Sequence, residues 1–329
     1  MTYKCASFFA GVGGIDLGFK RAGFNTIYAN EIEPKAIHTY EANFSIKVDK
    51  RDIRLVADDL EKDKNVISDF EILLAGFPCQ AFSIAGYRQG FDDEKGRGNL
   101  FFEVMRIVHI KKPKIIFLEN VKNLVTHDKG NTFKVITSSL ETEGYHITYK
   151  VLNTMDYGNL PQNRERIYII AFLDKNVLDN FHWISQVDLT TKLSDILDYK
   201  NKLDDMYYYT KEKFKRFNEI EGQITKRNTV YQWRRIYVRE NKNNVCPTLT
   251  ANMGTGGHNV PLILTDYGIR KLTPRECFLL QGFPESYILP EDTAPSHLYK
   301  QAGNSVSVNV IQRIAENISN ALKKDISEE

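Results

Sequence analysis

The sequence predicts an α/β fold, in which a doubly wound, mostly parallel sheet is joined to a second, smaller, loop-rich domain. Short apolar runs alternate with segments of helical spacing through the first half of the chain, as strands and helices do around a parallel sheet. A glycine-rich turn follows the first apolar run, at the edge where such sheets bind ligands. The alternation breaks down over residues 187–265, which indicates the separate domain.

The order of the elements follows from the apolar runs and from the turn residues between them. We expect strands at residues 4–9, 26–29, 72–75, 115–118, 147–152 and 166–172. We expect helices at residues 15–22, 34–43, 132–143 and 306–322. The third and fourth strands contain only apolar residues, which is typical of strands that are buried on both faces. The last two strands could pair as a hairpin.

Residues 1–184 are expected to form the first domain, and residues 185–301 the second. The final helix regains amphipathic spacing, so residues 302–329 should return to the first domain and complete it.

Composition is that of a soluble globular protein, since 42% of the 329 residues are hydrophobic and 26% are charged. The chain shows neither the apolar core of a signal peptide nor a run of about 18 apolar residues that could cross a membrane. We therefore expect a cytoplasmic protein with no membrane partner. The four cysteines are scattered and form no C-x-x-C pair, so we expect neither a disulfide nor a metal site.

Positive charge is concentrated in one part of the second domain. Residues 210–244 hold ten Lys or Arg against four Glu, a net charge of +6, whereas the whole chain carries +2 and the remainder therefore −4. Tyr231, Trp233 and Tyr237 are interleaved with these cations. Cations attract phosphate and aromatic rings offer stacking area, so this stretch is typical of a surface that faces nucleic acid. A solvated basic face is the alternative.

The glycine turn at residues 9–14 follows the first strand, and Glu31 closes the next strand. A dinucleotide fingerprint would place its third glycine at Asp16, where an acidic side chain would repel a pyrophosphate. An adenosine cofactor without phosphates, such as S-adenosylmethionine, fits better. Glu31 could accept hydrogen bonds from ribose hydroxyls, and Asp52 could meet the adenine amine. Taken alone, the turn is compatible with other nucleotide sites.

Cys79 directly follows Pro78 and the strand at residues 72–75, and Glu119 follows the next strand. Both side chains should lie on the edge that holds the glycine turn. A lone cysteine is more often a small buried hydrophobe. Here proline fixes the backbone before it and a carboxyl group shares the edge, so we interpret Cys79 as a nucleophile.

This pair suits the methylation of cytosine at carbon 5. That carbon takes a methyl group only after a thiolate has added at carbon 6. A carboxylic acid that stays neutral in a dry site can share a proton with ring nitrogen 3. Arg164 and Arg166 lead into a strand, where they should share a face and favour the thiolate, unless they only form a salt-bridged strand edge. The glycine-rich residues 83–100 are typical of an active-site lid.

With these motifs the chain closely resembles the bacterial C5-cytosine DNA methyltransferases, particularly the short enzymes of restriction-modification systems. The resemblance covers nearly the whole length. It rests on six ordered motifs: Phe9-Ala10-Gly11-Val12-Gly13-Gly14, Gly76-Phe77-Pro78-Cys79-Gln80, Glu119-Asn120-Val121, Gln162 with Arg164 and Arg166, Arg270-Lys271-Leu272-Thr273-Pro274-Arg275-Glu276-Cys277, and Gly303-Asn304-Ser305-Val306. It implies a Rossmann-like, S-adenosylmethionine-dependent methyltransferase fold with a target-recognition domain.

The resemblance implies that Cys79 is the nucleophile, that Glu119 contacts the flipped cytosine, and that Arg164 and Arg166 lie near its oxygen and the phosphates. The return of the C-terminal helix to the first domain would bring Asn304 and Ser305 to the cofactor, although they are far in sequence from its other expected contacts. The expected cofactor-binding residues are Phe9, Gly11, Val12, Gly13, Gly14, Glu31, Ile32, Asp52, Ile53, Pro78, Leu100, Asn304 and Ser305.

Family members read double-stranded DNA with the variable region that corresponds here to the basic domain. The expected DNA-binding residues are Gln80, Ser83, Arg88, Gln232, Arg234, Arg235, Tyr237, Thr248 and Thr250. A bidentate arginine to guanine contributes about 1 to 3 kcal/mol of discrimination. The recognised sequence itself does not follow from these residues.

We expect the protein to act on a short, specific site in the bacterial cytoplasm, at the nucleoid. A monomer is expected because it is the default for an enzyme that reads an asymmetric flipped base. A cognate restriction endonuclease could belong to the same system without forming a stable complex. Two alternatives stay open: a tRNA cytosine-5 methyltransferase on the same scaffold, and a catalytically idle DNA-binding regulator. The basic domain favours DNA over RNA, and the intact pair of Cys79 and Glu119 argues against the regulator.

Overall fold

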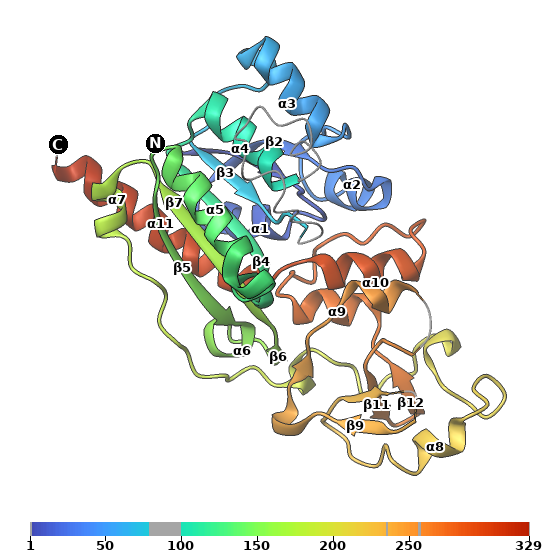
Figure 1. Cartoon of the computed structure of the whole chain (residues 1–329). Helices are drawn as coiled ribbons and strands as arrows, with labels where there is room; N and C mark the ends of the chain where they lie inside the picture. The colour runs from blue at the N-terminus through green and yellow to red at the C-terminus, as the bar shows by residue number, and fades with distance from the viewer. Residues whose placement is uncertain (1, 79–99, 235, 256–257, 329) are drawn as a thin grey trace. The chain divides into compact units, whose positions relative to one another are not determined.

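The structure is a computed structural model, and it describes residues 2–78, 100–234, 236–255 and 258–328. The chain forms two compact units (Figure 1). Unit 1 comprises Met1–Leu152, Glu165–Ser185 and Val310–Glu329, and unit 2 comprises Asn153–Arg164 and Gln186–Asn309. Each unit therefore combines segments that lie far apart in the sequence.

Unit 1 is built around a sheet in which six strands are described, in the order β2-β1-β3-β4-β7-β5. These strands are β1 (Lys4–Phe8), β2 (Asn25–Asn30), β3 (Ile72–Ala75), β4 (Ile115–Val121), β5 (His146–Asn153) and β7 (Glu165–Phe172). The pairs β1·β2, β1·β3 and β3·β4 are parallel, and β4·β7 is antiparallel. The predicted, mostly parallel sheet is confirmed, and the last two predicted strands are neighbours in it.

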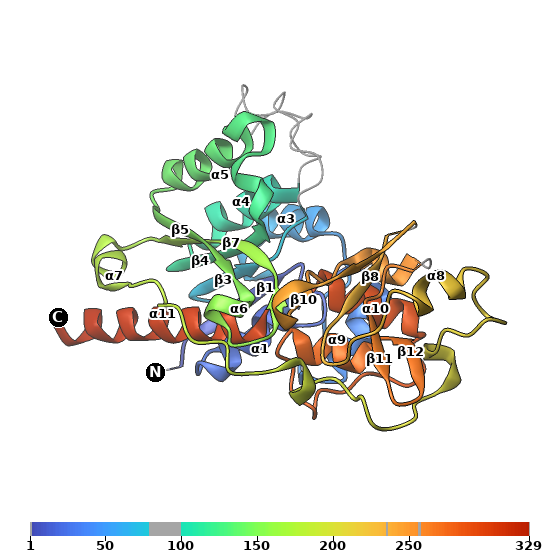
Figure 2. The same ribbon diagram turned by 90° about the horizontal axis from the view of Figure 1, so that it is seen from below.

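Helices cover both faces of this sheet (Figure 2). α3, α4 and α5 lie on one face, and α1 and α11 on the other. The described helices of unit 1 are α1 (Gly14–Arg21), α2 (Pro34–Glu41), α3 (Ile53–Lys62), α4 (Leu100–Lys111), α5 (Asn131–Thr142), α7 (Lys175–Asn180) and most of α11 (Val308–Glu328). The four predicted helices are present, whereas α3, α4 and α7 were not predicted.

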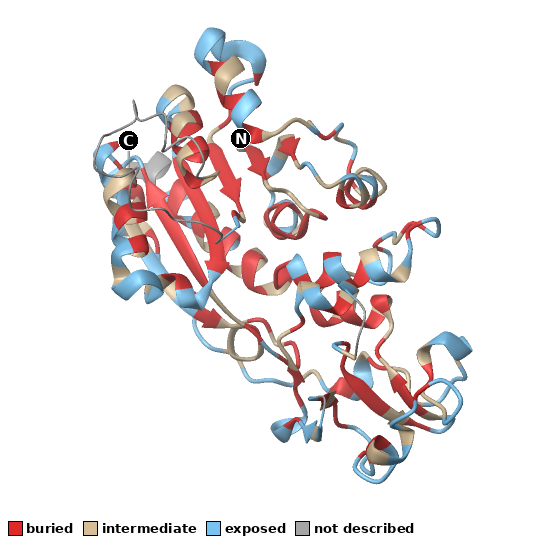
Figure 3. Cartoon of the chain, turned by 45° about the vertical axis from the view of Figure 1, so that its right-hand side comes forward, coloured by how far each residue is buried: buried red, intermediate tan, exposed pale blue. Residues whose placement is uncertain are grey.

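Alternate residues of the strands supply the two layers of the core, and most residues of the central strands β1, β3, β4 and β7 are buried, as the red strands of Figure 3 show. Leu73 and Ile116 pack with the helices of one face. On the other face, the rings of Phe19 and Phe117 meet edge to face, with centroids 5.1 Å apart. α11 approaches α1 so closely that a Cβ atom at Gly18 would overlap the side chain of Ile311. The final helix thus belongs to the core of unit 1.

Unit 2 has little regular structure and a small core. Its four-stranded sheet has the order β12-β11-β8-β9, and a short two-stranded sheet pairs β6 with β10. Its strands and α-helices are α6 (Thr154–Tyr157), β6 (Gln162–Asn163), α8 (Phe217–Glu221), β8 (Tyr231–Trp233), β9 (Val238–Glu240), β10 (Cys246–Pro247), β11 (Leu262–Thr265), β12 (Gly268–Lys271), α9 (Pro274–Leu280) and α10 (Pro295–Asn304). Long irregular segments join them, as a loop-rich region requires.

The core of unit 2 uses two of the aromatic residues that were expected on its surface. Tyr231 is fully buried and Trp233 is 9% exposed, and both pack with Phe214 and Leu262. Of the three interleaved aromatic residues, Tyr237 is the exposed one, at 50%. The prediction that all three face nucleic acid is wrong for Tyr231 and Trp233, because alternate residues of β8 point into the core.

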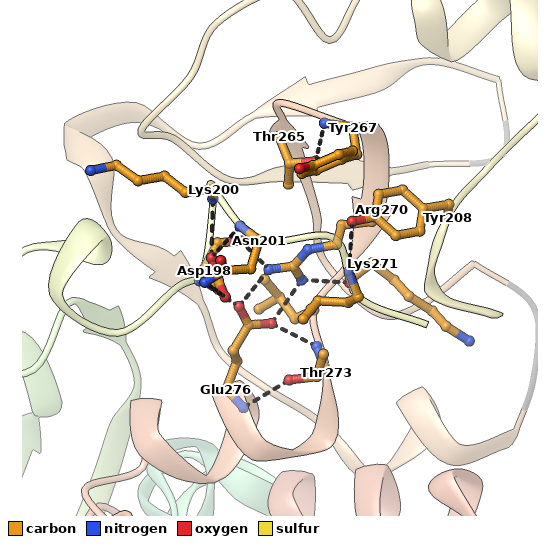
Figure 4. A network of polar contacts seen from close by, with 12 residues as sticks. Asp198, Lys200, Asn201, Tyr208, Thr265, Tyr267, Arg270, Lys271, Thr273 and Glu276 are labelled. Atoms are coloured by element: carbon orange, nitrogen blue, oxygen red, sulfur yellow. Dashed lines mark hydrogen bonds and ion pairs between the residues drawn. The ribbon is translucent and has the colours of Figure 1, made fainter. Parts of the chain in front are cut away.

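A buried ion pair organises the start of α9 (Figure 4). The Arg270 guanidinium donates from Nη1 to Glu276 Oε2 at 2.8 Å and from Nη2 to Glu276 Oε1 at 2.6 Å. Arg270 Nη2 also donates to the carbonyl of Asp198, and Glu276 accepts from the backbone amides of Asp198 and Thr273. Removing both charges from water is unfavourable, and further hydrogen bonds such as these help to offset that cost and fix the position of the pair.

A second buried carboxyl group, that of Asp16, lies in the first turn of α1. Its Oδ2 accepts a hydrogen bond from Ser7 Oγ at 2.9 Å, and its Oδ1 accepts one from Tyr40 Oη at 3.1 Å. The side chain therefore links β1, α1 and α2 inside the protein. Burial raises the pKa of Asp16 from 3.8 to about 6, although hydrogen bonds from Ser7, Tyr40 and Thr26 oppose the shift.

We predict that Asp16→Asn flattens the dependence of stability on pH. Because the pKa of Asp16 is about 6 in the folded protein and near 3.8 in the unfolded chain, ionisation favours unfolding. The wild type should lose up to about 3 kcal/mol of unfolding free energy from this group as the pH rises from 4 to 6, at ~1.4 kcal/mol per pKa unit. Urea denaturation at pH 4.5 and 7.5 measures the free energy of unfolding of both proteins. If the variant and the wild type differed in this free energy by the same amount at both pH values, the prediction would be contradicted.

Candidate active site

Glu31 closes the glycine turn that follows β1. Its Oε2 accepts a hydrogen bond from the Gly11 amide at 2.9 Å, and its Oε1 accepts from the amides of Ile32 and Glu33 at 2.8 and 2.9 Å. Phe9 has a φ of 55°, a conformation that costs an L residue about 1 to 3 kcal/mol and is found at ligand-binding turns. The structure brings Gly11 and Glu31 together, as the sequence predicts.

Asn30, the last residue of β2, connects this turn to the start of α3. Its side-chain amide donates to the carbonyls of Asp49 and Arg51, both at 2.9 Å. Asp52 then caps α3 by accepting from the amide of Arg54 at 2.9 Å. These hydrogen bonds hold Glu31, directly after β2, and Asp52, directly before α3, in fixed positions in unit 1.

The apolar residues predicted to bind the cofactor differ in exposure. Val12 and Ile53 are 4% and 2% exposed, whereas Ile32 is 59% exposed. An isoleucine exposed beside Glu31 offers an apolar surface for a flat ring. Pro78 is exposed, and Leu100 is the half-buried first residue of α4.

Asn120 fixes the chain that leads to Cys79. Its Nδ2 donates to the carbonyl of Phe77 at 2.8 Å in the interior, and its Oδ1 accepts from the next backbone amide. β3 and β4 are paired through Ala75 and Leu118, so the next residues, Gly76 and Glu119, lie side by side. A Cβ atom at Gly76 would be 3.6 Å from Glu119 Oε2.

Arg166 approaches Glu119 from the neighbouring strand. Its Nε lies 3.1 Å from Glu119 Oε1, and both side chains are largely buried. β7 runs antiparallel to β4, which places the two residues near each other at the same end of the sheet. A carboxyl group and a guanidinium thus share the edge onto which Phe77 and Pro78 lead.

The structure corrects the prediction that Arg164 and Arg166 share one face of a strand. β7 begins at Glu165, so Arg164 precedes the strand and the period of two does not apply to it. Arg164 belongs to unit 2, where its 2% exposed side chain donates hydrogen bonds to backbone carbonyls. The two arginines therefore have different partners.

The other predicted residues of unit 2 occupy two segments. Thr248 and Thr250 flank the buried Leu249, whereas Asn304 is the last residue of α10 and Ser305 follows it. Asn304 is exposed, and Ser305 is 7% exposed. Ser305 Oγ is buried and has no hydrogen-bond partner among the described residues.

A hairpin between β8 and β9 carries the predicted DNA-binding side chains. The Arg234 amide donates to the carbonyl of Tyr237 at 2.9 Å, and Arg234 Nη2 donates to Gln232 Oε1 at 3.1 Å. Arg234 is exposed, and Ile236 is 75% exposed at the same tip. The sequence analysis missed Ile236, although an isoleucine beside two arginines is an unusual tip residue.

The family model for C-5 cytosine-specific DNA methylase matches residues 3–320. The chain belongs to this family. As a C-5 cytosine DNA methylase, the protein methylates cytosine in DNA, which confirms the function that the motifs predict. The relatives give no support to the tRNA methyltransferase or to the idle regulator.

Similar proteins include two Type II methyltransferases. M.Bsp6I of Bacillus sp. (strain RFL6) is 59% identical over 317 residues, which cover 96% of this chain and 98% of the relative. M.HhaI of Haemophilus parahaemolyticus is 39% identical over 325 residues, with 95% and 93% coverage. A solved DNMT2 mutant of Spodoptera frugiperda superposes with a TM-score of 0.72 at 19% identity, covering 97% of this chain and all of that one, which supports the fold alone.

Several expected site residues of this methylase lie outside the described residues: Cys79, Gln80, Ser83, Arg88 and Arg235. The expected lid at residues 83–100 does so too, apart from Leu100.

The described cysteines are poor nucleophiles. Cys5, Cys246 and Cys277 are buried, and burial raises the pKa of each thiol. None of these three is suited to supply a thiolate at neutral pH.

Over the part of the chain that the structure describes, no helix is long and apolar enough to cross a membrane. The same residues contain no group of three or more His, Cys, Asp or Glu placed to hold a metal ion.

We predict that Asn120→Ala impairs both stability and methyl transfer. The variant leaves the buried Phe77 carbonyl without its donor, which should cost about 1 to 3 kcal/mol of unfolding free energy. Looser placement of the chain before Cys79 should lower kcat tenfold or more. Urea denaturation and methyl incorporation into DNA measure the two effects. Asn123→Ala, at an exposed position just after β4, is the matched control, and an equal loss of kcat in both variants would disprove the role of Asn120.

Proposed function

We propose that the protein transfers a methyl group from S-adenosylmethionine to carbon 5 of a cytosine that is flipped out of a short, specific sequence in duplex DNA. One observation carries this proposal: at the ends of β3 and β4, Asn120 fixes the chain before Pro78 and Cys79 next to Glu119. The chain that leads to Cys79 and the Glu119 carboxyl group thereby lie at one edge of the sheet.

The residues of the glycine turn fit S-adenosylmethionine. Glu31 presents carboxylate oxygens to ribose hydroxyls, Asp52 can accept from the adenine amine, and the exposed Ile32 can cover the ring. From unit 2 we propose Asn304 and Ser305, whose Oγ lacks a partner among the described residues. The bound cofactor would supply an electrophilic methyl group.

In the proposed mechanism, the Cys79 thiolate adds to carbon 6 of the cytosine. Glu119 shares a proton with ring nitrogen 3, which makes the ring more electrophilic, and Arg166 stabilises charge near the cytosine oxygen. Carbon 5 is then nucleophilic and takes the methyl group. Loss of the proton from carbon 5 restores the ring double bond and expels Cys79 as the thiolate.

For DNA recognition we propose the hairpin tip with Gln232, Arg234, Arg235 and Tyr237. Thr248 and Thr250 are proposed to contact phosphates, and Gln80, Ser83 and Arg88 to contact DNA near the flipped base. The exposed arginine and tyrosine at the tip support this assignment.

The Type II methyltransferase relatives favour a role in restriction-modification. We propose that the protein protects host DNA as a monomer in the bacterial cytoplasm, at the nucleoid. A cognate endonuclease of the same system would share the DNA site without forming a stable complex.

We predict that Cys79→Ala abolishes methyl transfer and retains cofactor binding. Incorporation of labelled methyl groups into DNA should fall at least about a thousandfold, because the first bond cannot form. The dissociation constant for S-adenosylhomocysteine should stay within about twofold, since the thiol is not part of that site. Cys5→Ala, at a buried cysteine, is the control and should keep its activity.

Trapping of the covalent intermediate tests the same nucleophile. With duplex DNA that carries 5-fluorocytosine at the mapped target, the wild type should form a complex that resists denaturation, because fluorine replaces the proton that must leave. Bisulfite sequencing of DNA from expressing cells maps the target. Full activity of the Cys79 variant would exclude this mechanism.

We predict that Arg234→Gln changes DNA recognition. A lost base contact should weaken binding of the target duplex about fivefold to a hundredfold and relax the methylated sequence. A lost phosphate contact should instead weaken binding to all sequences and reduce the salt slope by about one. Fluorescence anisotropy at several salt concentrations, with bisulfite profiling, separates these results.

Arg216→Gln is the control for the Arg234 variant. Arg216 lies in the same basic stretch, but it is paired with Glu219 at 2.7 Å and lies over the ring of Trp233. Equal effects of both variants would show that general charge, and not the hairpin tip, determines recognition.

A further inference from the structure

The side chain of Arg164 is enclosed by two segments of unit 2 that are far apart in the sequence. Its Nη1 donates to the carbonyl of Leu249 at 2.7 Å. Its Nη2 donates to the carbonyls of Gly303, at 3.3 Å, and of Ser305. With 2% of the residue exposed, the guanidinium acts as an internal link between these segments.

The two segments also touch through their backbones. A Cβ atom at Gly303, near the end of α10, would overlap the carbonyl group of Thr250. One turn further, a Cβ atom at Gly254 in the 3-10 helix Ala251–Thr255 would overlap the carbonyl oxygen of Ser296, near the start of α10. Because interiors are close-packed, neither segment can move without displacing the other.

The chain on either side of Arg164 holds it in place. The Arg164 amide donates to Asn153 Oδ1 at 3.0 Å. Gln162, which is fully buried, accepts from the Leu249 amide at 3.2 Å and donates to the carbonyl of Leu280 at 2.9 Å. The guanidinium is therefore a fixed reference for both segments.

We propose that Arg164 is a positioning residue that couples DNA binding to cofactor binding. This inference rests on the proposed function, which assigns Thr248 and Thr250 to DNA phosphates and Asn304 and Ser305 to the cofactor. Arg164 holds Leu249, which lies between the two threonines, and it holds Gly303 and Ser305, which flank Asn304. Ordering of one segment by its ligand orders the other through Arg164, so each ligand strengthens the binding of the other by the same factor.

Arginine suits this role better than lysine. Its planar fork offers five N–H donors in fixed directions, so one side chain can reach three carbonyls from two segments. A lysine ammonium has three donors on a single atom and cannot span the same distance between the carbonyls of Leu249 and Ser305. Arg164→Lys keeps the positive charge and removes the link.

The test measures coupling as a ratio of dissociation constants. S-adenosylhomocysteine is titrated calorimetrically into the free protein and into the protein saturated with a duplex that contains the mapped target. The wild type should bind it about tenfold more tightly in the presence of DNA. In Arg164→Lys the ratio should fall to within about twofold of one, with both ligands still bound.

Arg270→Lys is the matched control, because Arg270 is also a fully buried arginine of unit 2 but is paired with Glu276. It should lower stability and keep the wild-type ratio. A wild-type ratio of one, or an unchanged ratio in Arg164→Lys, would overturn the coupling. Failure of the wild type to bind S-adenosylhomocysteine or DNA at all would instead overturn the proposed function.

Hydrogen exchange of the wild type tests the coupling without any variant. S-adenosylhomocysteine alone should slow exchange of the amides at residues 248–251, and DNA alone should slow exchange at residues 303–306. Protection confined to the segment that binds each ligand would overturn the proposal, even if Arg164→Lys did not fold.

Discussion

The hydrogen bond from Asn120 to the carbonyl of Phe77 is the contact on which the candidate active site depends. The pairing of β3 with β4 ends at Ala75 and Leu118. Beyond these residues, hydrogen bonds from side chains must hold the backbone of the chain that follows β3. Asn120 does this for the chain before Pro78, and Glu31 does it for the glycine turn. Hydrogen bonds from side chains to the backbone therefore hold the edge of the sheet that carries the candidate active site. Strand pairing alone would not hold it.

Much of the fold could be predicted because the buried strands are short apolar runs between turn residues. The bounds of β3 were predicted to the residue. The three helices predicted in the first half, α1, α2 and α5, begin and end within two residues of the predicted positions. α3 was missed because its apolar residues are no more numerous than its polar ones, and α4 because Leu100 adjoins the glycine-rich segment. Composition likewise placed Tyr231 and Trp233 on the surface, although the period of two in β8 points them inward.

The candidate site was predictable where a side chain lies at the end of a strand, as Glu119 does in β4, or directly after one, as Glu31 does after β2. Arg164 was predicted as a site residue, but its role as an internal link was not, because its partners are carbonyl oxygens, and carbonyl oxygens carry no sequence signal. Arg270 is different, since its partner Glu276 belongs to the same motif. Both arginines fix irregular segments of unit 2, which has a small core. Only the pairing of Arg270 with Glu276 could be inferred from the spacing of residues in the sequence.

The described residues at the tip of the β8–β9 hairpin contribute no large side chain to the core of unit 2. Trp233 ends the inward-facing row, and Arg234, Ile236 and Tyr237 are exposed beyond it. Substitutions at such positions usually change stability by less than about 0.5 kcal/mol. Mutation and selection can therefore exchange the tip residues almost freely, so descendants of this protein could diverge in target preference while inheriting an unchanged scaffold.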